Sequence, residues 1–200
     1  MIGVPQEDED FKDFCRRNEL SDWEPYFHPS SEELIERVLE EIKESDVVLD
    51  IGAGNLYFAQ KVALKAEKVY ALEVNPYLVA RGLERIGFRI PRNLLVICAN
   101  ALDFPFPSGI TVATLLMRHC QHFRLYFQKL REAGCHFLIT NARWKTDFER
   151  IDLNSPRVPY KDLEEGWYAC SCGSVGYKGE GNLPQFPAVE VKDCPNCFNF

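Results

Sequence analysis

The sequence lacks the features of a membrane or secreted protein. Its longest stretch without a charged side chain, residues 104–117, is too short for a membrane span and contains two prolines. The first ten residues, MIGVPQEDED, have neither the basic flank nor the apolar run of a secretory signal. We therefore expect a soluble, cytoplasmic protein with no membrane partner.

The sequence also has no repeat or low-complexity segment, and a hydrophobic fraction of 46% excludes disorder throughout its 200 residues. The net charge of −7 argues at first against a nucleic-acid partner, because phosphate repels an anionic protein. The acids are concentrated at the start, however: residues 1–50 hold 16 acidic and 5 basic side chains, and residues 51–200 hold 14 acidic and 18 basic ones. An RNA partner for the later part of the chain is therefore not excluded.

Short apolar runs alternate with segments of helical periodicity over residues 30–140. The runs expected to form strands are 47–51, 69–74, 94–98, 111–117 and 135–140. The first expected helix follows the capping box at 30–33 and ends near Glu44, and the others span 57–64, 76–86 and 123–133. Near-continuous apolar strands that alternate with helices predict an α/β fold with a doubly wound, mainly parallel sheet.

Composition divides the chain into four expected parts. An acidic lead-in with several aromatic residues occupies 1–29, and the α/β domain occupies 30–145. A charged, turn-rich connection follows at 146–165, and a small cysteine-containing β module completes the chain at 166–200.

A glycine turn follows the first expected strand, where open α/β sheets bind their ligands. Gly52 and Gly54 form this turn, and acidic residues stand where three successive strands end: Asp50, Glu73 and Asp103. A dinucleotide-binding turn would have a further glycine at the position of Tyr57 and would rarely carry an acid at Asp50. These residues favour a nucleoside-like ligand that carries a positive amino group.

At this point the sequence resembles the class I, Rossmann-like S-adenosylmethionine-dependent methyltransferases. The matching segments are Asp50-Ile51-Gly52-Ala53-Gly54, Glu73 and Asn100-Ala101-Leu102-Asp103. The resemblance implies that the turn lies under the methionine part of S-adenosylmethionine, that Glu73 takes the ribose hydroxyls and that Asp103 reads the adenine. It implies the following cofactor-binding set: Phe27, His28, Asp50, Gly52, Gly54, Asn55, Leu56, Glu73, Val74, Asn100, Ala101, Asp103 and Met117.

The segment Phe27-His28-Pro29-Ser30 is also similar to one that closes over the cofactor in RNA adenine methylases. Two departures from the family pattern stand beside this likeness. Leu56 occupies the place of a third glycine, so we expect Asn55 to adopt the left-handed conformation. The Asn-Pro-Pro-Tyr-like motif that holds a target amine is replaced by Leu116-Met117-Arg118-His119-Cys120.

Two residues after the fourth expected strand are candidates for catalysis. His119 would act as a general base if the acceptor must lose a proton early, and Arg118 would pair with a phosphate or carboxylate. The alternative for His119 is a histidine at the rim of the sheet with a structural role.

Four of the eight cysteines lie in the last 31 residues, in the pairs Cys170-Ser171-Cys172 and Cys194-Pro195-Asn196-Cys197. Four thiolates in two short turns predict a structural zinc site in a zinc-ribbon-like module, with a thiol redox pair as the alternative. Because the module has few basic residues, we expect it to complete the fold or to contact a protein rather than to clamp phosphate.

The sequence therefore favours a zinc-containing S-adenosylmethionine-dependent methyltransferase with RNA as its substrate, such as a ribosomal RNA base. Two alternatives remain open at this stage. One is a methyltransferase for a small molecule or protein, and the other is a catalytically silent cofactor-binding subunit that docks a partner through the zinc module.

Overall fold

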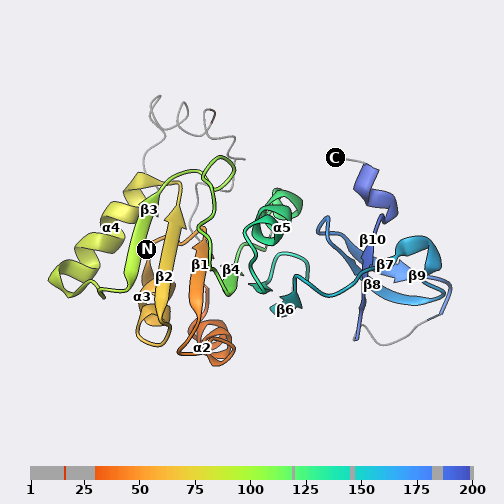
Figure 1. Cartoon of the computed structure of the whole chain (residues 1–200), viewed down its shortest axis with the longest axis horizontal. Coiled ribbons are helices and arrows are strands. Elements are labelled where there is room, and N and C mark those ends of the chain that lie inside the picture. Colours follow the sequence, from red (N-terminus) through yellow and green to blue (C-terminus); the bar gives the residue numbers. More distant parts are fainter. Residues whose placement is uncertain (1–15, 17–29, 119, 145–146, 182–186, 199–200) are drawn as a thin grey trace.

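A computed structural model of the chain describes residues 16, 30–118, 120–144, 147–181 and 187–198. These residues form two sheets that lie beside each other along the long axis of the molecule (Figure 1). The larger sheet contains the glycine turn, and the smaller one carries the clustered cysteines.

The larger sheet has six strands in the order β3-β2-β1-β4-β5-β6. Their bounds are Val47–Ile51 for β1, Lys68–Glu73 for β2, Leu94–Cys98 for β3, Val112–Leu115 for β4, Phe137–Thr140 for β5 and Glu149–Asp152 for β6. The first five strands pair in parallel, and β6 pairs antiparallel with β5. This arrangement confirms the mainly parallel sheet expected from the sequence.

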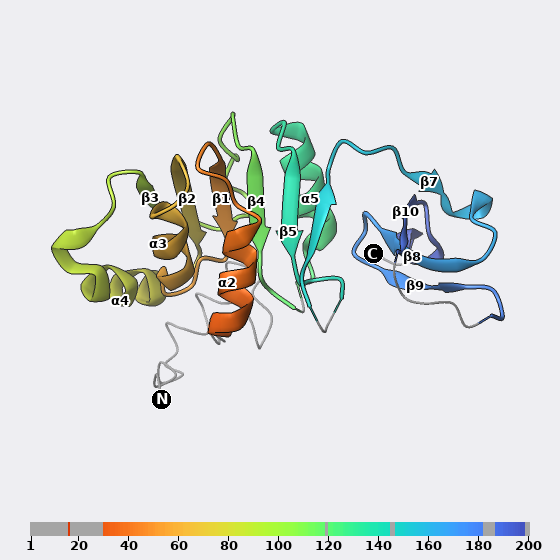
Figure 2. The ribbon, with the colours of Figure 1, turned by 90° about the horizontal axis from the view of Figure 1, so that it is seen from below.

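Helices cover both faces of this sheet, so its strands are buried on both sides (Figure 2). One face packs against α2 (Glu32–Glu40), α3 (Tyr57–Ala63) and α4 (Pro76–Ile86), and the short helix η1 (Gly87–Arg89) follows α4. The opposite face packs against α5 (Phe123–Glu132). Neighbouring strand residues alternate between the two cores: Val48 belongs to the first and Leu49 to the second.

The smaller sheet has four strands in the order β7-β10-β8-β9. Their bounds are Val158–Pro159 for β7, Gly166–Cys170 for β8, Val175–Lys178 for β9 and Val189–Lys192 for β10; short helices span Tyr160–Asp162 (η2) and Pro195–Phe198 (η3). Its core is small and includes Cys170, Cys172 and Cys194. The expected C-terminal β module is therefore present.

The structure differs from the sequence-based expectation in the segment 146–165, which we expected to be a connection. Strand β6 adds an edge to the larger sheet, and β7 adds an edge to the smaller one. The sequence did not predict β6 because only Ile151 of its four residues is buried, so the strand has no apolar run, as is usual at the edge of a sheet. The lead-in 1–29 lies outside the described residues apart from Arg16, and the division into four parts stays a prediction.

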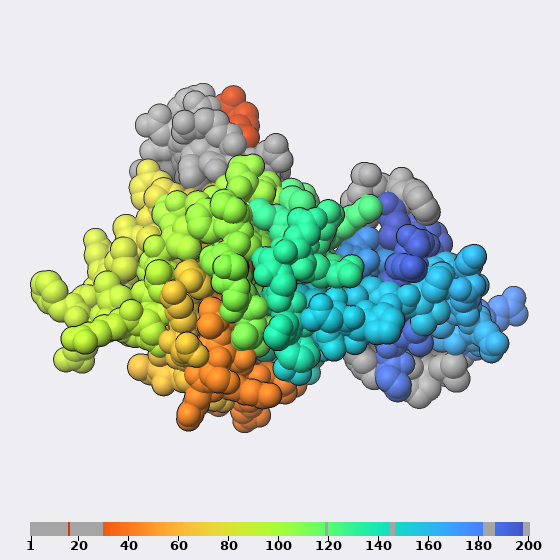
Figure 3. Space-filling model, viewed as in Figure 1, coloured from red at the N-terminus to blue at the C-terminus, as the bar shows by residue number. Residues whose placement is uncertain are grey.

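A buried arginine joins the two sheets. The Arg143 side chain is completely buried, and its guanidinium donates to the carboxylates of Glu149 and Glu190. A further bond runs from Arg143 Nη1 to the carbonyl of Cys170, at 3.4 Å. Because Glu149 begins β6 and Glu190 lies in β10, one side chain ties both sheets together, and the space-filling view shows the two parts in contact (Figure 3).

The turn between β1 and α3 is shaped by Leu56. Leu56 has a φ of 63° and a ψ of 8°, whereas the side chain of Asn55 accepts a hydrogen bond from the backbone N–H of Tyr57 at 3.1 Å. Our expectation that Asn55 takes the left-handed conformation is therefore wrong. The Leu56 side chain is fully buried, and this burial offsets the cost of a left-handed backbone.

Helix α4 packs directly against this turn at Gly82. A Cβ at Gly82 would lie 2.5 Å from the carbonyl oxygen of Asn55 and 2.8 Å from Cγ of Leu56. Any side chain at this position would therefore push α4 away from the turn.

We expect Leu56→Gly to be more stable than Leu56→Ala. Both variants lose the buried leucine, at a cost of about 2–5 kcal/mol, but only glycine also removes the left-handed strain, worth about 1 kcal/mol. Urea unfolding of both variants measures the difference. The control is Ala59→Gly inside α3, where glycine should instead cost about 1 kcal/mol; an alanine variant at position 56 that is as stable as the glycine variant would contradict this account.

Candidate functional site

The glycine turn and the end of β2 are held together by Glu73. This side chain is 7% exposed, and its two oxygens accept hydrogen bonds from the backbone N–H groups of Gly54, at 2.7 Å, and Asn75, at 2.8 Å. Burial raises the pKa of Glu73, and the hydrogen bonds from these amides oppose that rise. Glu73 is thus a buried carboxylate at the ligand-binding edge of the sheet, with unused lone pairs after these two bonds.

Asp50 leaves an unsatisfied oxygen at the same edge. It is 3% exposed, and Oδ1 accepts a hydrogen bond from Thr114 Oγ1 at 2.7 Å, whereas the buried Oδ2 has no partner. Burial raises the pKa of Asp50 to about 7, the Thr114 bond opposes the rise, and the nearby charge of Glu73 adds to it. A buried carboxylate with an unpaired oxygen suits a positively charged ligand group, so the residues present fit the amino end of S-adenosylmethionine.

Gly52 provides the open surface of the turn. It is exposed, with a φ of 76°, and a Cβ at this position would lie 3.0 Å from Sδ of Met117. Met117 therefore lies against the turn from the loop after β4, and its predicted contact with the cofactor stays a prediction. Any side chain at Gly52 would strain the backbone and press on Met117.

The loop after β3 completes this edge of the sheet. Its start is tied to β2 by a hydrogen bond from Ala99 N–H to the Glu73 carbonyl at 3.0 Å. Ala101 is buried and Asp103 is exposed, and both belong to a turn that begins at Asn100. Val74 is half buried directly after β2.

The structure thus brings together the acids, the glycine turn and the loop after β3 on one edge of the sheet. Contact of these residues with a cofactor stays a prediction. Phe27, His28 and His119 lie outside the described residues, and Arg118 is exposed after β4. The sequence analysis missed Thr114, whose only signal was a hydroxyl in an otherwise apolar strand beside β1.

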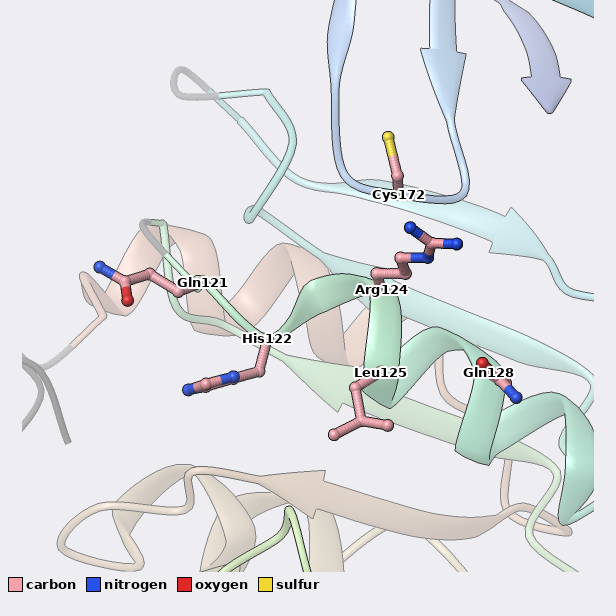
Figure 4. A pocket seen from close by; sticks show the side chains of 6 residues that line it. All are labelled: Gln121, His122, Arg124, Leu125, Gln128 and Cys172. Carbon is pink, nitrogen blue, oxygen red and sulfur yellow. The ribbon is translucent and has the colours of Figure 1, made fainter. Parts of the chain in front are cut away.

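A shallow pocket of about 240 Å³ lies beside the first turns of α5 (Figure 4). Its lining residues are Gln121, His122, Arg124, Leu125, Gln128 and Cys172. Arg124 extends towards the loop that carries Cys172, and its Nη1 donates to the Cys197 carbonyl at 2.9 Å (Figure 4). The pocket shares no residue with the predicted cofactor set, and we interpret it as the junction between α5 and the cysteine module.

The four C-terminal cysteines converge as a metal site requires. Their Sγ atoms all lie within 4.8 Å of one another. Three of the pairs are closer: 3.6 Å for Cys170 and Cys197, 3.5 Å for Cys172 and Cys194, and 3.8 Å for Cys194 and Cys197. Four sulfurs bound to one zinc ion at about 2.3 Å would be about 3.8 Å apart, so the spacing fits a tetrahedral thiolate site.

Two short backbone turns hold these sulfurs. Gly173 N–H donates to the Cys170 carbonyl at 3.0 Å, and Cys197 N–H donates to the Cys194 carbonyl at 2.9 Å. Gly173 has a φ of 98° and packs against Phe123, the first residue of α5. The turn that carries Cys170 and Cys172 therefore packs directly against α5.

The sheet order, the glycine turn and the acidic strand ends define a Rossmann-like S-adenosylmethionine-dependent methyltransferase fold. The profile of the ribosomal RNA adenine dimethylase family matches residues 30–130. The chain belongs to this family, a family of S-adenosylmethionine-dependent methyltransferases.

Curated relatives match parts of the chain at moderate identity. An uncharacterised protein of Methanocaldococcus jannaschii is 36% identical over 84 residues, which cover 41% of this chain and 31% of that protein. A probable ribosomal RNA small subunit methyltransferase A of Methanosarcina mazei is 37% identical over 68 residues, which cover 34% of this chain and 24% of that protein. The chain thus spans about a quarter to a third of the length of these relatives.

Among solved structures, a dimethyladenosine transferase from Plasmodium falciparum shares the fold. It has a TM-score of 0.50 and 21% sequence identity, and the match covers 56% of this chain and 41% of that one. Within the part of the chain that the structure describes, no helix has the length and apolarity needed to cross a membrane.

The buried carboxyl of Asp50 predicts a specific pH dependence of stability. An aspartic acid in the unfolded chain loses its proton near pH 4, whereas Asp50 in the fold loses it at about pH 7. Between these values the folded protein binds the extra proton, so this group lowers stability as the pH rises, by up to about 4 kcal/mol.

Asp50→Asn should remove this loss, because asparagine has no proton to release. Urea unfolding at pH 4 and pH 8 should show a smaller decrease in stability for Asp50→Asn than for the unmodified protein. The exposed Asp162→Asn serves as the control and should change nothing. Parallel pH profiles for the unmodified protein and Asp50→Asn would contradict the raised pKa, because they would show that folding does not change the proton binding of Asp50.

Proposed function

We propose that this protein is an S-adenosylmethionine-dependent methyltransferase that acts on RNA. The observation that carries the cofactor assignment is the unpaired, buried Oδ2 of Asp50 beside the glycine turn and Glu73. An ammonium group would satisfy this oxygen and the charge of Asp50 at once. A neutral donor would satisfy the oxygen but leave the buried charge without compensation.

Three acidic side chains each bind a different part of the cofactor. Asp50 binds the ammonium of the methionine part, Glu73 accepts from the ribose hydroxyls, and Asp103 accepts from the amino group of adenine. The bound sulfonium supplies an electrophilic methyl group. The protein aligns the acceptor with it and excludes water, and Met117 contributes an apolar wall against Gly52.

RNA is the acceptor that the family favours, and the excess of bases after residue 50 supports it. Arg118 is exposed after β4 and would pair with an RNA phosphate. His119 would act as general base for a hydroxyl acceptor. The segment Leu116–Cys120 has no amide side chain to hold an exocyclic amine, and this observation favours testing proteins and small molecules as acceptors too.

We expect the protein to bind S-adenosylmethionine and Glu73→Gln to weaken binding about 10- to 100-fold. The substitution removes the charge from an acceptor of two ribose hydroxyls, and it also turns an NH2 group towards one of the two backbone N–H groups that Glu73 accepts from. Circular dichroism shows that the variant is folded before its affinity is compared. Titration calorimetry measures the affinity. The matched control is Glu67→Gln, which is exposed just before the start of β2, at the opposite edge of the sheet, and should bind normally. No binding by the unmodified protein would refute the cofactor assignment.

Transfer from radiolabelled S-adenosylmethionine into total RNA, protein and small-molecule fractions then identifies the acceptor class. Label in RNA that is lost in Gly52→Arg supports the proposal. Label only in protein or small molecules corrects the substrate, and cofactor binding without any transfer indicates a silent subunit that docks a partner.

We also propose that Cys170, Cys172, Cys194 and Cys197 bind one structural zinc ion. The near-tetrahedral spacing of the sulfurs and the all-thiolate donor set support zinc, because a closed site of four thiolates leaves no position for a substrate. The module has a small core, so metal binding would supply much of its stability.

We expect one zinc ion per chain in the purified protein and its loss in Cys194→Ser, measured by atomic emission. Loss of the ion should also make residues 166–198 sensitive to limited proteolysis, because their small core cannot hold the fold alone. Cys98→Ser, an exposed cysteine at the end of β3, is the control and should retain the metal. Full zinc occupancy in Cys194→Ser would rule out this ligand set.

A further inference from the structure

Lys129 of α5 binds the backbone of the loop after β3. Its ammonium donates to the carbonyl oxygens of Ala101, at 2.6 Å, Leu102, at 2.8 Å, and Phe104, at 2.9 Å. An ammonium has three donors, so these bonds use all of them. The nitrogen also lies 4.6 Å from the centre of the Phe106 ring.

The N–H groups of the same turn are bound from the other side by Asn100. Its side-chain oxygen accepts from Leu102 N–H at 3.0 Å, and its carbonyl accepts from Asp103 N–H and Phe104 N–H at 3.2 Å and 2.9 Å. Lys129 and Asn100 thus bind three of the four carbonyls and three of the four amides of residues 101–104. The backbone of this turn is held in one conformation from within the fold.

Asp103 is the one charged residue of this turn, and its carboxylate is free to bind a ligand. Asp103 is exposed, and no hydrogen bond among the described residues uses its carboxylate. Burial lowers the pKa of Lys129, and the negative charge of Asp103 acts against that shift, so the two groups are electrostatically coupled. Holding a partly buried ammonium on backbone carbonyls costs solvation, and its result is a fixed backbone from which the short Asp103 side chain extends.

We propose that Lys129 is a positioning residue that makes Asp103 selective for a 6-aminopurine over a 6-oxopurine. This inference rests on the proposed binding of S-adenosylmethionine. On a rigid turn the Asp103 carboxylate accepts a hydrogen bond from the 6-amino group, but it faces a carbonyl oxygen in a 6-oxopurine and loses that hydrogen bond. On a loose turn the carboxylate can move to the N1–H group of the 6-oxopurine and form a new hydrogen bond. The selectivity between the two purines therefore depends on the rigidity that Lys129 gives to the turn.

The test compares the affinities of S-adenosylhomocysteine and S-inosylhomocysteine for the full chain by titration calorimetry. We expect the unmodified protein to prefer the 6-amino compound about 10- to 100-fold, the effect of one mispaired charged hydrogen bond. In Lys129→Met, which retains the length of the side chain, this ratio should fall below about threefold. Circular dichroism confirms that each variant is folded.

The smaller domain offers a matched control. Lys178 likewise donates from its ammonium to three carbonyls of a turn, those of Tyr160, Lys161 and Leu163, but it lies outside the cofactor edge. Lys178→Met should leave the ratio at the unmodified value. Asp103→Asn should lower the ratio, and adding Lys129→Met to Asp103→Asn should change it no further, because both substitutions act through the same carboxylate.

Several results would overturn the inference. A ratio in Lys129→Met equal to that of the unmodified protein would make Lys129 a purely structural residue. No preference in the unmodified protein would refute a selective Asp103, while leaving the cofactor assignment intact. Failure of the unmodified protein to bind either compound would refute the proposed function itself. If Lys129→Met does not fold, Lys129→Gln, which keeps two donors, should give an intermediate ratio.

Discussion

The buried guanidinium of Arg143 is the interaction on which the arrangement of the two domains depends. Burial disfavours its charge, but the hydrogen bonds that it donates to the carboxylates of Glu149 and Glu190 more than compensate, and the pKa of Arg143 lies above its usual range. Removing one partner from such a buried network typically costs about 3–5 kcal/mol, because the remaining charge is left without compensation. The contact between the domains thus has a buried electrostatic centre, and the bond from Arg124 to the Cys197 carbonyl and the packing of Gly173 against Phe123 place the cysteine module beside α5.

Other charged side chains in the fold also bind groups that would otherwise lack a hydrogen-bond partner. Glu73 binds two backbone amides beside the glycine turn, and Lys129 and Lys178 each bind three carbonyls of a turn. In each case a long charged side chain satisfies backbone groups that no regular element pairs. Loops that carry functional residues are thereby made rigid without being lengthened or covered by additional structure.

The sequence predicted the features that depend on local pattern. Apolar runs located the parallel strands, and the acids at strand ends located the ligand-binding edge, because topology alone brings these ends together. It did not reveal β6, whose polar residues form an edge strand only when Arg143 and Phe137 are in place beside it. Nor did it reveal the left-handed Leu56 or the role of Lys129, since each depends on contacts between residues distant in the chain.

The close packing at Gly82 limits which residues relatives of this chain can carry at that position. The backbone of the turn itself comes so close to α4 that position 82 has no room for even a methyl group: a Cβ there would lie 2.5 Å from the carbonyl oxygen of Asn55. Removing the Leu56 side chain would leave this backbone contact in place. Position 82 should therefore be glycine in every relative whose turn follows the same course, whichever residue stands at position 56.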